Sequence, residues 1–122
     1  MSQRLSAPAP VVRLVPELVE YAAERYGERP FLLRHAAGTW SGYTFMAAAR
    51  AVRAFAALLE GEGVRPGARV ALQSDNRPEW GLAYLAVLAA GAVVVPLDAQ
   101  LKNLEVGEIL VFAEVTHAVC DT

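Results

Sequence analysis

Hydrophobic residues between positions 63 and 98 form two short unbroken runs with a helical pattern between them. The first run, Arg69–Gln73, follows a Pro-Gly turn and predicts a buried strand. A helix is predicted over residues 78–90, because a proline and a glutamate suit its first turn and Gly91 suits its end. The second run, residues 92–95, is rich in β-branched residues and is typical of a strand covered on both faces. The pattern therefore predicts one β-α-β unit of a parallel sheet.

Ahead of this unit the pattern predicts a helix, a β-hairpin and a second helix. The first helix starts at Pro16 and stops at Gly27. Residues 30–35 read as a strand, and residues 39–43 return as its hairpin partner after an Ala-Ala-Gly turn. Thr44 is the expected N-cap of the longer helix that follows. The buried face of that helix is predicted to hold Phe45, Ala48, Ala49, Val52, Phe55, Ala56 and Leu59.

A third helix over residues 103–113 and a third parallel strand over residues 116–121 complete the predicted elements. The helix is expected to bury Val106, Ile109, Leu110 and Ala113. The fold class is α/β: an N-terminal helix and β-hairpin followed by a βαβαβ parallel-sheet unit, forming a three-layer subdomain of a larger fold. Residues 1–14, with two Ala-Pro pairs, are expected to form a flexible arm, and residues 15–122 a single subdomain.

Nothing after the third strand would cover the growing edge of the sheet, and an exposed apolar edge is a liability that proteins usually manage. We therefore expect the chain to be part of a longer polypeptide, and a homodimer through the same edge is the other way of covering it. The length of 122 residues, 55% hydrophobic and 20% charged, fits one globular domain. A net charge of −2 argues against a nucleic-acid binder, which needs a basic face.

No transmembrane segment is expected, because the apolar run over residues 81–97 is shorter than the roughly 20 residues of a span and is divided by Gly91 and Pro96. Cys120 is the only cysteine, so an internal disulfide and a multi-cysteine metal site are excluded. We predict that Cys120 is a small buried hydrophobe and that the protein resides in a reducing compartment, the cytoplasm.

Three carboxylates are predicted at the carboxyl ends of the strands, where open parallel sheets bind ligands: Asp75, Asp98 and Asp121. They could serve acid-base chemistry or Mg²⁺ binding. The favoured interpretation is that Asp75 caps the following helix, with Ser74 and Asn76 as other cap candidates, while the other two are solvated loop residues. An anion cradle here is disfavoured, because Pro78 removes an amide and no glycine-rich phosphate loop is present.

The two histidines, His35 and His117, lie in predicted strands and are interpreted as structural or surface residues. No Ser-His-Asp or Cys-His arrangement is indicated. Trp40 and Trp80 are predicted to anchor packing. We therefore predict no catalytic, cofactor-binding or metal-binding residue in this chain.

Several segments resemble the AMP-forming acyl-CoA synthetases and their adenylating relatives. Residues 88–98 look like the second core motif of that family. Residues 43–45 resemble its first core motif, with the Thr-Tyr order reversed. Residues 64–72 are similar to its strand entry, with Ala68 in place of an aspartate. Asn76–Trp80 looks most like the fatty acyl-CoA synthetase branch.

Residues 101–121 are similar to the helix-strand unit after the second motif, without its usual Pro-Glu-Glu opening. The resemblance spans about residues 30–122. It implies a two-step ligase that forms an acyl-adenylate from ATP and a fatty acid, with Mg²⁺ offsetting phosphate charge, and then transfers the acyl group to coenzyme A.

In the family the phosphate loop, adenine-binding motif, ribose-binding aspartate and catalytic lysine all follow the part that this chain resembles, so the resemblance carries over no functional residue. It implies the N-terminal scaffold fragment of a fatty acid-CoA ligase, inactive by itself, whose partner is the remainder of the synthetase. ATP, Mg²⁺ and coenzyme A are implied for the intact enzyme and none for this chain. Whether the chain counts as an enzyme stays open.

The alternative is a natural short non-catalytic protein that uses the same scaffold for association. A flavodoxin-like nucleotide binder is weaker, because a phosphate loop is lacking.

Overall fold

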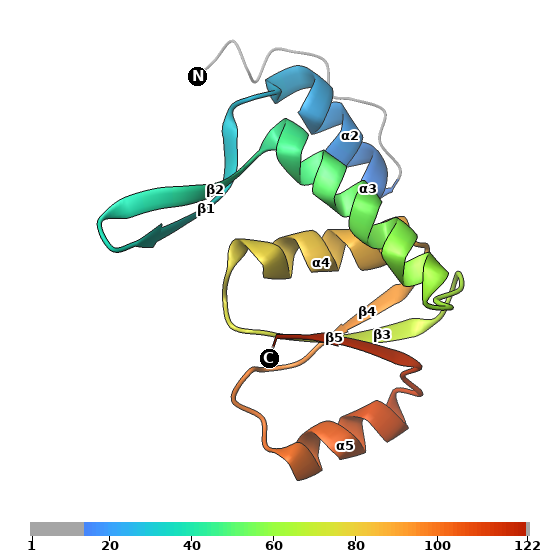
Figure 1. The fold of residues 1–122 in the computed structure, drawn as a ribbon. Coiled ribbons are helices and arrows are strands. Elements are labelled where there is room, and N and C mark those ends of the chain that lie inside the picture. The colour runs from blue at the N-terminus through green and yellow to red at the C-terminus, as the bar shows by residue number, and fades with distance from the viewer. Residues whose placement is uncertain (1–13, 122) are drawn as a thin grey trace, which may run out of the picture.

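The computed structural model describes residues 14–121, and Figure 1 shows their arrangement. Most of the predicted arm, residues 1–13, lies outside the described residues. In chain order the elements are α2 (Val15–Tyr26), β1 (Pro30–Ala36), β2 (Thr39–Thr44), α3 (Phe45–Gly61), β3 (Arg69–Gln73), α4 (Pro78–Ala89), β4 (Val93–Pro96), α5 (Asn103–Phe112) and β5 (His117–Cys120).

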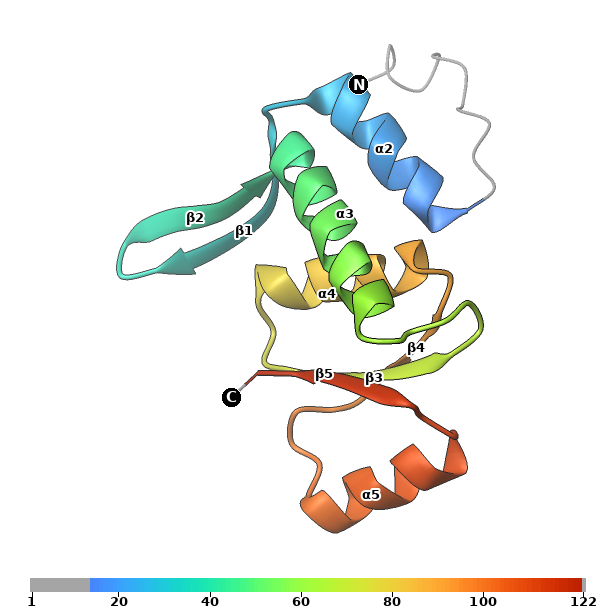
Figure 2. The same cartoon turned by 45° about the vertical axis from the view of Figure 1, so that its right-hand side comes forward.

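The predicted α/β fold is confirmed, with β3 at the centre of a parallel sheet in the order β4-β3-β5. Val70 of β3 stands opposite Val94 of β4 and His117 of β5. The hairpin β1–β2 is a separate antiparallel ribbon. Helix α4 covers one face of the sheet with α3 and α2 stacked beyond it, and α5 lies alone on the other face (Figures 1 and 2).

The hydrophobic core lies between α3, α4 and the central strand. Three consecutive β3 residues, Val70, Ala71 and Leu72, are almost completely buried. They are enclosed because neighbouring strands flank β3 on both sides and α4 covers one of its faces. Val70 forms one core cluster with buried apolar residues of α4 and of the end of α3. The turn-strand-helix order that the sequence predicts therefore encodes the centre of the fold.

Helix α3 has the predicted cap and buried face. The Ala47 amide donates to Thr44 Oγ1 at 3.0 Å, which satisfies one of the free amides of the first turn. Five of the seven predicted residues are buried, while Phe45 and Phe55 are half-buried. Beside this face Arg53 Nη1 donates to both carboxylate oxygens of Glu20 on α2, each at 2.8 Å.

Thr44→Ala should destabilise the chain by about 1 kcal/mol, because the Ala47 amide loses its acceptor. Urea denaturation followed by circular dichroism measures the change. Thr44→Ser keeps the hydroxyl and serves as the control, so it should retain most of the stability. An unchanged midpoint for Thr44→Ala would contradict the capping role.

Several burial predictions for the second half of the chain are wrong. No residue of α5 is buried: Val106, Ile109, Leu110 and Ala113 are only half-buried. Strand β4 is not covered on both faces, since Val93 is 48% exposed, and Cys120 on β5 is exposed rather than buried. The common reason is that, among the described residues, α5 is the only helix on that face of the sheet.

Among residues 14–121, the structure shows no helix with both the length and the apolar character that a membrane crossing requires.

Candidate functional site

The carboxyl ends of β3, β4 and β5 meet at one rim of the sheet, as the parallel topology requires. Gln73 Nε2 donates to the Asp98 backbone carbonyl at 2.9 Å, joining β3 to the end of β4. The Asp75 amide donates to Asp121 Oδ2 at 3.2 Å, joining the loop after β3 to the end of β5. Asp98 Oδ1 accepts from the Gln100 amide at 2.8 Å. These polar groups link strand ends and order loops.

The prediction that Asp75 caps α4 is wrong, and neither Ser74 nor Asn76 takes its place. The N-cap is Arg77, which makes no side-chain cap hydrogen bond. The residue before a proline is held extended, and Arg77 has φ −148° and ψ 159° accordingly. Pro78 then starts the helix, where its missing amide costs nothing. Proline geometry rather than a polar cap therefore decides where α4 begins.

The three rim carboxylates are not gathered into one group in the described structure. Among residues 14–121 there is no group of three or more histidine, cysteine, aspartate or glutamate side chains that could hold a metal ion. Asp98 and Asp121 are exposed and are engaged by neighbouring amides.

A polar cluster that the sequence analysis missed lies where the hairpin meets the start of α4. Arg77 Nε donates to Glu79 Oε1 at 2.9 Å. The Tyr43 hydroxyl of β2 faces the same carboxylate. Arg77 lowers the pKa of Glu79, and that carboxylate in turn raises the pKa of Tyr43, chiefly by accepting its hydrogen bond. The charge of Glu79 also suits the positive end of the α4 dipole.

This cluster sets an expected pH dependence. In the folded protein the pKa of Glu79 lies below its ordinary value of 4.5. The charged Glu79 therefore stabilises the fold at pH values above 4.5, and this stabilisation is lost as the pH falls through the lowered pKa of the folded state. Glu79→Gln should therefore lower the Tm slightly at pH 7 and flatten the loss of Tm between about pH 5 and pH 3. Thermal unfolding followed by circular dichroism across this range measures both effects. Glu105→Gln on α5 is the matched control, and an equal flattening there would contradict the assignment.

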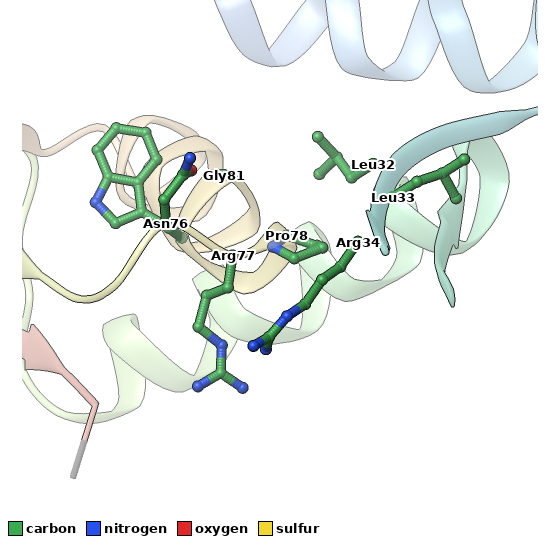
Figure 3. A pocket seen from close by; sticks show the side chains of 8 residues that line it. Leu32, Leu33, Arg34, Asn76, Arg77, Pro78 and Gly81 are labelled. Atoms are coloured by element: carbon green, nitrogen blue, oxygen red, sulfur yellow. The ribbon is translucent and has the colours of Figure 1, made fainter. Parts of the chain in front are cut away.

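Two adjoining hollows form a cleft between the hairpin and the start of α4. One has a volume of about 330 Å³ and the other about 360 Å³, and they share Arg34 and Pro78. Figure 3 shows Arg34 and Arg77 extending their guanidinium groups to the same side, with Leu32 on the hairpin wall. A smaller apolar hollow of about 110 Å³ continues toward the rim. The residues that line the first two hollows are Leu32, Leu33, Arg34, Ser41, Gly42, Tyr43, Asn76, Arg77, Pro78, Glu79, Trp80 and Gly81.

The cleft offers charged groups and two hydroxyl groups, those of Ser41 and Tyr43. Its lining residues include neither a histidine nor a cysteine that could act as base or nucleophile. The one carboxylate among these lining residues, Glu79, is already paired with Arg77. Its contacts join the hairpin to the helical layer, so the geometry supports a positioning role for this region.

The structure assigns each histidine a local contact. His117 Nε2 donates to the Glu62 carbonyl at 3.0 Å, and its Nδ1 lies 2.8 Å from Thr116 Oγ1, so the ring ties β5 to the end of α3. His35 packs against Trp40 with ring centroids 4.8 Å apart. Trp40 is 65% exposed, so the prediction that it anchors the core is wrong. Trp80 is half-buried and packs against Tyr84.

Comparison with known proteins gives a consistent result. The family described as AMP-binding enzyme matches residues 19–122. An octahydroindenyl-propanoyl:CoA ligase from Rhodococcus jostii is 35% identical over 104 residues, covering 85% of this chain and 19% of the ligase. A long-chain-fatty-acid–CoA ligase from Salmonella typhimurium is 31% identical over 113 residues, covering 84% of this chain and 19% of the ligase.

Solved structures show the same fold. The N-terminal subdomain of NpsA from Klebsiella oxytoca superposes with a TM-score of 0.79 at 24% identity, covering 91% of this chain and 28% of that one. The fatty acid AMP ligase from Legionella pneumophila superposes with a TM-score of 0.81 at 20% identity, covering 98% of this chain and 21% of that one. The chain thus spans 19% of the length of the two CoA ligases above. With the family match running from residue 19 to residue 122, the chain belongs to the AMP-binding enzyme family.

Proposed function

We propose that this chain is the N-terminal scaffold subdomain of an ATP-dependent fatty acid-CoA ligase. The observation that carries the proposal is the pair of coverage values: the match takes in 84–85% of this chain but only 19% of each CoA ligase. A chain of this kind contributes a folded layer to a larger enzyme. ATP, Mg²⁺ and coenzyme A are then bound by the remainder of the ligase.

The contacts at the rim and cleft support a scaffold role. At the rim, the Gln73 side chain and the Asp75 amide donate hydrogen bonds to residues at the ends of the neighbouring strands. At the cleft, Glu79 is shared between Arg77 and Tyr43. Groups that satisfy one another in this way hold a framework in place, and the sequence has no glycine-rich loop that would bring backbone amides to a phosphate.

A long-chain fatty acid is the proposed substrate of the intact ligase. The segment Asn76–Trp80 resembles the fatty acyl branch, and the Salmonella typhimurium relative is named for long-chain fatty acids. The exposed, unpaired thiol of Cys120 fits a reducing compartment, so the proposal places the enzyme in the cytoplasm.

Release of pyrophosphate from ATP in the presence of a fatty acid tests this proposal. The longer polypeptide that contains this chain should release pyrophosphate with hexadecanoate and, when coenzyme A is added, form the thioester. It should respond much less to acetate. The 122-residue chain alone should release none. Turnover by the short chain would overturn the scaffold role, and a longer polypeptide that prefers acetate would overturn the proposed substrate.

A further inference from the structure

The outward side of α5 is apolar and uncovered. Leu104, Val111 and Phe112 are 83%, 80% and 91% exposed. They border a shallow hollow of about 600 Å³. We define the α5 face as the residues that line this hollow: Asn103, Leu104, Gly107, Glu108, Val111 and Phe112. Exposed patches of this kind mark places where another polypeptide surface belongs.

The opposite side of α5 is apolar too. Val106, Ile109 and Leu110 are half-buried and only partly covered. Helix α5 makes only sparse contacts with the other described elements, and Figure 2 shows it alone below the sheet. Apolar side chains thus lie on both sides of α5, interrupted by Glu105 and Glu108, and soluble domains normally cover apolar surface of this extent. Among the described residues, the parallel sheet covers one side of α5 and no element covers the other side.

Gly107 lies at the centre of the α5 face. Glycine is unfavourable inside a helix, second only to proline. A Cβ atom added at Gly107 would meet no atom within 4 Å, so no contact inside the described structure requires a glycine there. Absence of a side chain lets another backbone approach a helix closely. The position is thus best explained by a closely packed neighbour beyond the described residues.

The size of the face favours one occupant over another. A stable dimer buries about 20–30 residues on each side, whereas this face offers six. A segment of the same polypeptide needs a smaller contact, because the covalent link keeps it at high effective concentration. The CoA ligases that match this chain are much longer, since it spans 19% of their length.

We infer that the α5 face packs against the remainder of the ligase chain, through a helix or strand whose backbone lies against Gly107. This inference rests on the proposed function, because it needs the longer polypeptide. Helix α5 is then enclosed between the parallel sheet of this subdomain and a second layer supplied by the rest of the enzyme.

Two matched glycine substitutions test the contact. Gly107→Ala and Gly61→Ala each place a methyl group on a helix in open space. In the 122-residue chain both should raise the Tm, by up to about 4 °C, through helix propensity. In the intact ligase Gly61→Ala should keep its neutral or positive effect, whereas Gly107→Ala should lower the Tm because the methyl displaces the neighbouring backbone. A rise of Tm with Gly107→Ala in the intact ligase would overturn the inference.

Hydroxyl-radical footprinting gives a second readout that needs only the intact ligase. Modification of Leu104 and Phe112 should be at least fivefold slower in the folded ligase than in the same protein unfolded in urea. Equal modification in the two states would overturn the inference. Sedimentation equilibrium of the 122-residue chain should show a monomer. A dimer that Phe112→Glu dissociates would instead assign the face to a second copy and would equally overturn it.

Failure of the inference is separable from failure of the proposed function. Thioester formation by the intact polypeptide reports on function, while the glycine pair and the footprint report on the α5 face. An active ligase with an exposed α5 face would refute the docking surface alone. An inactive polypeptide with a protected face would refute the proposed activity alone.

Discussion

Leu72→Ala is expected to destabilise the chain by about 2–5 kcal/mol. Leu72 is 1% exposed on the central strand β3 and packs below α4. Its truncation loses the transfer free energy of the removed methyl groups and leaves a cavity that the flanking strands cannot close. Since domains of this size are stable by roughly 5–15 kcal/mol, a large part of the total would be lost. Urea denaturation followed by circular dichroism and tryptophan fluorescence measures the change.

Leu58→Ala is the control for this experiment. Leu58 is 58% exposed on the outer side of α3, so the same chemical change leaves no cavity there. Its cost should stay within about 1 kcal/mol. Equal losses of stability for the two variants would show that β3 is not the centre of the core.

Elements whose pattern is local were predictable from the sequence. Strand β3 has the predicted bounds, because a turn, a run of apolar residues and a polar exit enclose it. Thr44 is the cap of α3 because a threonine stands immediately before a regular apolar stripe. Gly91 follows α4 with a φ of 75°, the left-handed conformation expected where the helix ends.

Burial around α5 could not be predicted, because apolar composition shows that a segment needs cover without showing what covers it. Valine and cysteine are residue types that are usually buried, yet Val93 and Cys120 are both exposed in the described structure. Residues 103–112 carry apolar side chains on more than one side of the helix, interrupted by Glu105 and Glu108, so their periodicity does not identify which side faces the sheet. The same ambiguity makes the α5 face informative about what lies beyond this subdomain.

The site depended on tertiary contacts that no local pattern encodes. Tyr43 and Glu79 come from a hairpin and a helix far apart in the sequence, and only the fold brings them together. The rim carboxylates were predicted at the correct edge, but their partners were not. Asp75 offers its amide to Asp121 rather than its carboxylate to α4. The Arg77-Pro78 pair did indicate where α4 begins, because the residue before a proline is held extended and the helix can then start at the proline without a polar cap.

The connection between the hairpin and the helical layer gives the second large expected effect. Gly42 of β2 pairs with Leu33 of β1 and has φ +154°. A Cβ atom there would overlap the backbone carbonyl of Leu32, and backbone cannot rotate away as a side chain can. Gly42→Ala should therefore force the ribbon out of register and cost at least about 2 kcal/mol. Thermal unfolding gives the loss, and hydrogen exchange of the β1 and β2 amides locates it.

Gly38→Ala separates backbone strain from this steric overlap. Gly38 also has a positive φ, +76°, at the hairpin turn, but a Cβ atom there meets nothing within 4 Å. It should cost about 1–2 kcal/mol from the left-handed conformation alone and leave the paired amides protected. Gly42→Ala should in addition accelerate exchange along the hairpin and reduce the dependence of the Tm on Glu79, because Tyr43 follows Gly42 directly while the pairing of Glu79 with Arg77 stays in place. If both variants lost the same stability with intact amide protection, the close approach of Leu32 would not be what requires glycine at position 42.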